Sequence, residues 1–234
     1  MTPMNTEIIK AVELIEDFSL YPRSKVDATH VQYLAHSLAA GETLPPLIVD
    51  QQNRLIDGFH RRRAYLRIFG DKSTVCVERR KYKEDKEAFL DALRLNSRHG
   101  KGITGSEQTG AIIKANQFKI DHESIASAMG ITSERYQVIT RSKIAKIDDS
   151  KMEIALKRSV MHLRRKGNKV SKSQVEAINS APGQPQSLIL LQINRLIESD
   201  LIDWDNEKVV NGFKRLWGNL EKAKEHFQPG DTNE

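Results

Sequence analysis

A cluster of basic side chains follows a glycine within residues 55–70, LIDGFHRRRAYLRIFG. The apolar start of this stretch predicts a buried strand, and Gly58 precedes a helix that opens with His60, Arg61 and Arg62. The first N–H groups of a helix point outward with the positive end of its dipole, and a glycine lets the backbone approach a ligand closely. Stacked positive charge at a helix N-terminus is otherwise unfavourable, so the pattern predicts a phosphate site. The alternative is that the arginines face solvent or pair with acids.

A second pattern with chemical meaning is HESIASAMGITSERYQVITRSKI, residues 122–144. An apolar helix face with a small Ala126, a glycine at Gly130 that allows positive φ, and a cap at Thr132 or Ser133 predict a helix-turn-helix. Its second helix would enter the major groove of double-stranded DNA. The side chains predicted to contact DNA there are Ser133, Arg135, Tyr136, Gln137, Arg141 and Lys143. A plain helical hairpin could carry the same spacing.

The charge distribution favours a polyanion as partner. The 234-residue chain has a formal net charge of +6 and a sequence pI of about 9.3. Twelve Lys or Arg and three acids lie between Arg135 and Lys172. This density predicts further phosphate contacts after the second helix, at Arg164, Arg165, Lys166 and Lys169. A solvated basic face is the alternative.

The elements that must position these residues follow from local patterns. In the first hundred residues, helices are predicted at 7–16, 28–41, 61–70 and 84–96, and strands at 44–50, 54–58 and 74–80. Between residues 103 and 166 only helices are predicted, and two apolar helices follow at 186–200 and 207–227.

The fold class expected is α+β, with a small N-terminal domain, then an all-α helix-turn-helix domain and a C-terminal helical bundle. The expected domains are 1–102, 103–175 and 176–234, and the last is a candidate dimerisation region. The single cysteine, Cys76, excludes a disulfide framework within the chain, and the histidines lack metal-ligand spacing. With no signal peptide and no run of 18 apolar residues, a cytoplasmic protein without membrane contact is expected.

The stretch LIDGFHRRRA resembles the phosphate-binding box of the ParB/sulfiredoxin-like superfamily, whose chromosome-partition members read G-E-R-R-x-R-A. Gly58, Arg61, Arg63 and Ala64 match, whereas Phe59 replaces the glutamate, and a histidine replaces the first arginine. Downstream, ALRLNSRHGKGIT resembles the N-x-x-H-G-x-x-L-T form of ParB-like regulators. There an asparagine at position 96 matches and a leucine at 95 replaces the family's glutamate.

The resemblance implies a ParB-like transcription regulator or partition-type factor, acting on double-stranded DNA as a homodimer. It implies a ParB/sulfiredoxin-like N-terminal domain that either binds a phosphate-bearing ligand, CTP or ATP with Mg²⁺, or is a degenerate relic of such a domain without a cofactor. The residues implied for this ligand are Gly58, His60, Arg61, Arg62, Asn96 and His99, although His99 could be only a turn residue. With Phe59 and Leu95 in place of glutamates, little or no hydrolysis is expected. The alternatives are a nucleotide-hydrolysing enzyme, kinase or nuclease of the same superfamily, and a protein-interaction module that binds no DNA.

Overall fold

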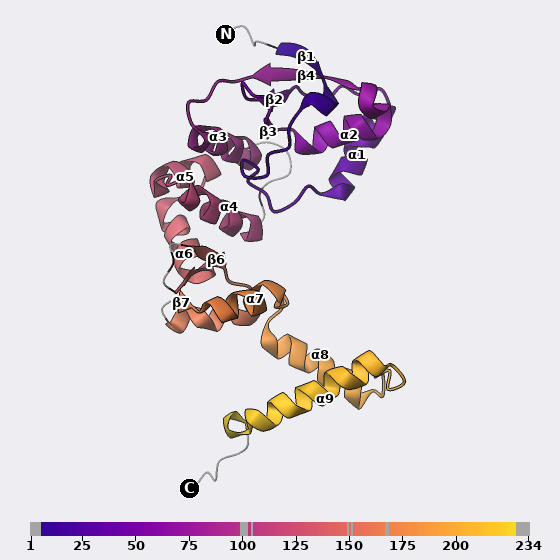
Figure 1. Cartoon of the computed structure of the whole chain (residues 1–234), viewed down its shortest axis with the longest axis vertical. Coiled ribbons are helices and arrows are strands. Elements are labelled where there is room, and N and C mark those ends of the chain that lie inside the picture. Colours follow the sequence, from indigo (N-terminus) through magenta and orange to yellow (C-terminus); the bar gives the residue numbers. More distant parts are fainter. Residues whose placement is uncertain are drawn as a thin grey trace. The chain divides into compact units, whose positions relative to one another are not determined.

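The computed structural model describes residues 6–98, 103, 105–148, 150, 152–166 and 169–227, without the side chains of 98 and 163–166. The chain divides into two compact units, Met1–Ala181 and Pro182–Glu234 (Figure 1). In the part that the structure describes, none of the helices combines the length and apolar character needed to cross a membrane.

A four-stranded sheet forms the N-terminal part of the first unit. Its order is β1 (Thr6–Lys10), β4 (Thr74–Arg79), β2 (Leu47–Val49) and β3 (Leu55–Asp57). Strands β2 and β4 are parallel, whereas β2 and β3 form an antiparallel pair, a hairpin. The chain therefore leaves the sheet through β3 and enters the next helix at Gly58.

The helix predicted at residues 7–16 is wrong. Its first half is the edge strand β1, paired antiparallel with β4, and a short 3₁₀-helix, η1 (Ala11–Glu13), follows. Ile9 packs on the core while Ile8 stays 76% exposed. Two adjacent isoleucines fit the hydrophobic period of a helix as well as that of a strand. The segment forms a strand because β4 offers hydrogen-bond partners to its backbone.

Three helices complete this part of the unit: α1 (Ala28–Ala39), α2 (Phe59–Phe69) and α3 (Asp85–Arg98). The carboxylate of Asp27 caps α1 by accepting the N–H groups of Thr29 and His30. Helices α1 and α2 pack together through an apolar cluster that contains Val31 and Ala64. Helices α1 and α2 therefore lie side by side (Figure 1).

Helices α4 (Gly105–Gln117), α5 (His122–Met129) and α6 (Ser133–Lys143) follow. Their core is continuous with that of the preceding elements, because one hydrophobic cluster joins Ile56 of β3 and Phe89 of α3 to Ile112, Ile125 and Ile139. The sheet, α3 and these three helices therefore share a single packed interior.

The prediction of no strand between residues 103 and 166 is wrong. A small sheet of β5 (Ile144–Ile147), β6 (Glu153–Ala155) and β7 (Lys169–Val170), in the order β6-β5-β7, follows α6 directly. One face of this sheet buries Ala145, Ile147 and Val170 against Ile178 of α7 (Lys172–Ser180). The 3₁₀-helix η3 (Arg158–Lys166) connects the last two strands. Strands of two to four residues carry too little alternation to be recognised from sequence.

The second unit contains α8 (Gln186–Glu198), α9 (Glu207–Lys222) and the short 3₁₀-helix η4 (Lys224–His226). Both long helices lie where the apolar periodicity predicts them. Asn206 caps α9 by accepting the N–H group of Lys208. No residue of α8 or α9 is buried.

Candidate functional site

Gly58 forms the turn between β3 and α2. Its φ of 107° and ψ of 19° lie in the left-handed region, and a Cβ added there would stand 2.7 Å from Cγ of Leu47, which is buried. Only glycine meets both demands without strain. Since Gly58 offers no side-chain cap, the first N–H groups of α2 depend on other partners.

A cavity of about 530 Å³ opens at this N-terminus of α2. Its polar lining includes Arg23, His60 and Arg61, and the acids Asp57 and Glu78. Its apolar lining comes from α1, the proline pair before β2, and the end of α3, and includes Leu34, Pro45, Pro46, Ile48 and Leu95. The lining thus combines a helix N-terminus, cationic side chains, two acids and apolar side chains, and a helix N-terminus with cations beside apolar surface suits an anionic ligand with an apolar part.

Hydrogen bonds hold the guanidinium group of Arg61 in place at the edge of this cavity. One terminal nitrogen donates to the carbonyl oxygens of Pro45 and Pro46, at 2.9 and 2.8 Å, and the other pairs with Asp57 at 2.6 Å. Arg61 therefore holds the loop before β2 against α2 as well as lining the cavity. Arg61 is thus paired with an acid, the alternative left open by the sequence, and it also lines the cavity; phosphate binding by this residue stays a prediction.

Arg62, predicted to bind phosphate, does not line the cavity. Its Nε donates to the carbonyl of Ala11 and it pairs with Glu16 at 3.1 Å, while Arg63 pairs with the other oxygen of Glu16 at 2.6 Å. Burial alone would raise the pKa of Glu16, but the hydrogen bonds and charges of Arg63 and Arg62 outweigh it and lower that pKa. Glu16 is 46 residues away from Arg62 in the chain, so local spacing could not reveal this partner.

His60 and Asn96, both predicted to bind the nucleotide, line the cavity. The Nε2 atom of His60 accepts the N–H group of Asp27 at 3.0 Å, which ties the start of α2 to the cap of α1. The side-chain oxygen of Asn96 accepts from Nε of Arg23 at 3.1 Å. Nothing in the sequence motifs pointed to Arg23, which is buried and also pairs with Glu107 of α4 at 3.5 Å.

Two further residues that the sequence motifs single out are Phe59 and His99. Phe59, which replaces the family's glutamate, lies in the core, 1% exposed, and stacks on Tyr21 with 4.2 Å between the ring centroids. His99 lies outside the described residues. Among the residues that the structure describes, no group of three His, Cys, Asp or Glu side chains could hold a metal ion.

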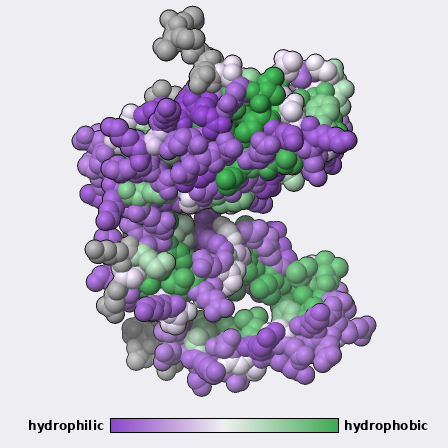
Figure 2. Space-filling model, turned by 45° about the horizontal axis from the view of Figure 1, so that its top comes forward, coloured by the Kyte–Doolittle hydropathy of each residue, from purple (hydrophilic) through white to green (hydrophobic). Residues whose placement is uncertain are grey.

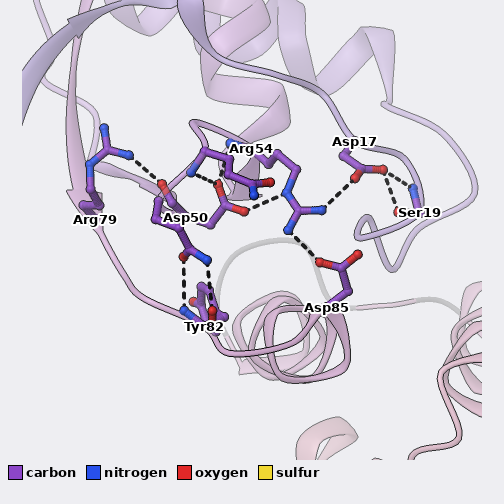
Figure 3. Close-up of polar contacts among 9 residues, drawn as sticks. Asp17, Ser19, Asp50, Arg54, Arg79, Tyr82 and Asp85 are labelled. Carbon is purple, nitrogen blue, oxygen red and sulfur yellow. Dashed lines mark hydrogen bonds and ion pairs between the residues drawn. The ribbon is translucent and has the colours of Figure 1, made fainter.

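A charged network on the β2–β3 turn fixes the hairpin that leads to Gly58 (Figure 3). Asp50 is fully buried and accepts the backbone N–H groups of Gln52 and Arg54. Nε of Arg54 donates to Asp50 at 2.7 Å, and the rest of its guanidinium pairs with Asp17 and Asp85. One arginine thus joins the turn to the loop after η1 and to the start of α3.

The α5–α6 pair has the local geometry that the sequence predicts. Gly130 ends α5 with φ 65°, and the hydroxyl oxygen of Thr132 caps α6 by accepting the N–H group of Arg135 at 3.1 Å. Four of the side chains predicted to contact DNA are exposed on α6: Ser133, Arg135, Gln137 and Arg141. A fifth, Lys143, is half-buried.

Tyr136 does not face outward as predicted. It is 6% exposed, belongs to the main hydrophobic cluster, and its hydroxyl group donates to the side-chain oxygen of Asn116 on α4. Tyr136 lies about 100° around the helix axis from Arg135, on the face of α6 that packs on α4 and the core. The exposed face of α6 therefore consists of the residues on either side of Tyr136.

The basic segment after α6 is described only in part. The side chains of Arg164, Arg165 and Lys166 lie outside the described residues. Lys169 is exposed on β7 and lies opposite Lys146 of β5 in the register of the small sheet.

No family model and no curated protein matches the chain. Two solved pNOB8-like ParB N-domain structures are similar to 64% of it at 17% identity, with TM-scores of 0.38 and 0.39. The C-terminally truncated chromosome-partitioning protein ParB from Caulobacter crescentus is similar in complex with CTP-gamma-S (18% identity, TM-score 0.37) and with the centromeric parS site (17%, 0.43). These cover 76% and 84% of this chain and 94% of theirs.

The chain spans 56% and 53% of the two pNOB8-like structures, about half their length. All four structures belong to ParB proteins, the group that the Gly58 motif resembles.

Proposed function

We propose that this protein is a ParB-like, sequence-specific DNA-binding protein, acting as a transcription regulator or a partition-type factor. The observation that carries the proposal is the exposed face of α6, which follows the tight turn at Gly130 and presents Arg135, Gln137 and Arg141. An arginine can bond guanine through two hydrogen bonds, and a glutamine can bond adenine in the same way. Helix α6 would be the helix that reads the major groove.

The basic residues after α6 would contact phosphates rather than bases. Lys169 is exposed, and the sequence places Arg164, Arg165 and Lys166 just before it. Each phosphate contact releases a counterion and steepens the salt dependence of binding without adding sequence preference. A helix of this length covers few base pairs, so two copies of the chain would bind two half-sites as a homodimer.

The test is selection of bound fragments from sheared genomic DNA, followed by gel shifts of the selected site in a salt series. Specific binding that weakens on replacing Arg135 and Gln137 by alanine, with non-specific binding retained, supports the proposal. Arg67→Ala is the matched control, because Arg67 is exposed on α2, away from α6. Equal loss for all sequences would place the reading helix elsewhere, and no DNA binding at all would favour a protein-interaction module.

We further propose that the cavity at Gly58 binds a nucleotide such as CTP or ATP with Mg²⁺, and that this ligand modulates DNA binding. The cavity volume of about 530 Å³ lies within the range of roughly 300–1,000 Å³ for small-molecule sites. The N-terminus of α2, His60 and Arg61 would hold the phosphates. Mg²⁺ binds nucleotide sites mainly through phosphates and water with one or two carboxylates. The carboxylates that line the cavity are Asp57, which pairs with Arg61, and Glu78, which pairs with Arg80.

Hydrolysis is not part of the proposal. Phe59 and Leu95 stand where ParB proteins carry glutamates, Phe59 is buried, and Leu95 presents an apolar side chain to the cavity. No carboxylate is left at these positions to arrange a metal or a water molecule. A nucleotide turnover assay with Mg²⁺ tests the enzymatic alternative, and turnover that a cavity variant abolishes would favour it.

Calorimetry with CTP, ATP and GTP in the presence of Mg²⁺ tests binding. Leu34→Trp fills the cavity from α1 without removing a polar contact, so it should abolish the heat of binding. Leu44→Trp is the matched control, since Leu44 packs on the same apolar cluster as Leu34 but does not line the cavity. If no nucleotide gives a heat of binding, the cavity is a degenerate site that binds no nucleotide. The proposal of DNA binding is not affected by that result.

A further inference from the structure

One apolar side chain lies on the exposed face of α6. Val138 is 53% exposed, whereas the other large hydrophobic residues of α6, Tyr136 and Ile139, are buried; all residues of this helix are described. Two steps along a helix rotate the side chain by about 200°, so Val138 lies almost opposite Tyr136 around the axis. It therefore points away from the hydrophobic cluster on which α6 packs.

The fold does not account for a valine at this position. None of the apolar clusters of the described residues contains Val138. A β-branched residue also favours a helix less than alanine does, because its χ1 freedom is restricted there. Exposed apolar residues elsewhere gather in patches on a mostly hydrophilic surface, as Figure 2 shows for one face of the molecule. A single valine is too small a patch for a protein partner, so its neighbours on α6 must indicate its role.

The neighbours of Val138 on this face are side chains proposed to read bases. Arg135 precedes it by three residues and Arg141 follows it by three, so each lies about one helical turn away. Each is about 4.5 Å from Val138 along the helix axis, compared with about 3.4 Å between successive bases of a DNA strand. A helix that brings Arg135 and Arg141 to base edges therefore brings Val138 to a base edge between them.

Two polar neighbours of Val138 make hydrogen bonds within α6 and its cap. The hydroxyl group of Ser142 donates to the backbone carbonyl oxygen of Val138 at 2.6 Å. A hydrogen bond from the side chain of Thr132 lowers the pKa of Glu134, whose charge also suits the N-terminus of the helix. Between the two arginines, the group that α6 offers to a base is therefore the pair of methyl groups of Val138.

We propose that Val138 reads the 5-methyl group of a thymine that lies between the bases contacted by Arg135 and Arg141. This inference rests on the proposed DNA function and adds a residue that determines its specificity. In the major groove thymine presents a methyl group, and an apolar side chain is the kind of group that contacts it. Cytosine in the same place would lose water from its amino group without gaining a hydrogen bond, so it would be disfavoured.

Replacement of thymine by uracil tests this contact with the full chain. The selected DNA site is first amplified by PCR, so that the copies carry no 5-methylcytosine. Each thymine is then replaced in turn by deoxyuridine, which lacks only the 5-methyl group. At one position the dissociation constant from gel shifts should rise about fourfold, which corresponds to roughly 0.8 kcal/mol for one buried carbon group.

The same titrations with Val138→Ala assign the methyl contact to this residue. Thymine and uracil should bind this variant alike at that position, because the two methyl groups of valine are gone. Val138 is exposed and alanine favours a helix, so the variant should unfold at the same urea concentration as the wild type. Val12→Ala is the matched control, since Val12 is 43% exposed on η1, and it should keep the fourfold preference.

Three results would overturn the inference. A wild-type chain that binds the amplified site equally well with uracil at every position makes no methyl contact, and a preference that persists unchanged in Val138→Ala belongs to another residue. Both results leave the proposed DNA function intact. Loss of binding on amplification would assign the methyl group to 5-methylcytosine instead of thymine. A chain that selects no DNA site at all would refute the DNA function together with this contact.

Discussion

Replacing Gly58 by alanine should destabilise the first unit more than any comparable glycine change. The residue has φ 107°, and the added methyl would lie 2.7 Å from the buried Leu47. The backbone conformation costs an L-residue roughly 1–2 kcal/mol, and forcing a methyl into a packed interior costs roughly 1–3 kcal/mol more. The sum is about 2–5 kcal/mol, because Leu47 can move only by shifting β2.

The control is Gly130→Ala, where φ is 65° and nothing lies within 4 Å of the added Cβ. Only the backbone strain applies there, so about 1 kcal/mol is expected. Urea unfolding followed by circular dichroism measures the loss of unfolding free energy in both variants. The Tm should fall by about 2–4 °C for each kcal/mol lost in a unit of this size. Equal destabilisation of the two variants would refute the argument that contact with Leu47 requires glycine at this turn. The Gly58→Ala chain should also lose any nucleotide heat, since the start of α2 must shift.

Three further results are expected. Arg54→Ala leaves the fully buried Asp50 without its charged partner and should cost roughly 3–5 kcal/mol in urea unfolding; a loss below about 1 kcal/mol would mean that the backbone donors to Asp50 suffice. The lowered pKa of Glu16 stabilises the fold above the unfolded pKa of about 4.3, and this contribution is lost as pH falls through the lower folded pKa. Glu16→Gln should therefore be less stable than the wild type at pH 7, with the gap closing toward pH 3, and a gap independent of pH would contradict this linkage. Arg135→Ala should weaken binding to the selected DNA by about 1–3 kcal/mol in gel shifts, and Arg67→Ala should not.

Much of the candidate cavity could be recognised from local sequence. The apolar run before Gly58, the glycine itself and the periodic residues after it predict a strand, a turn and a helix, and the structure has β3, the turn and α2 in those places. The turn and the helix cap of the α5–α6 pair could also be predicted from sequence. Gly130 ends α5 and Thr132 caps α6, and both make their contacts with residues three or four positions away. Such signals are local and survive without knowledge of the fold.

The side-chain partners at the cavity depended on residues far away in the chain. Arg61 and Arg62 look equivalent in sequence, but successive residues of a helix point about 100° apart. One therefore reaches Asp57 and the proline carbonyls, and the other reaches Glu16. Arg23 lines the cavity through a buried contact with Asn96, 73 residues further along the chain.

By itself, the sequence determined the turns at Gly58 and Gly130, the positions of helices such as α1, α2, α8 and α9, and which stretches are basic or apolar. Glycine conformation, capping and periodicity act over a few residues, so local sequence is enough for these features. The tertiary structure decided whether residues 6–10 form a strand or a helix, whether Tyr136 faces the core or solvent, and which arginine points to the cavity. These outcomes depend on the partners β4, α4 and Glu16. Such partners lie tens of residues apart in the chain and meet only through tertiary packing. Local sequence patterns therefore cannot predict these contacts.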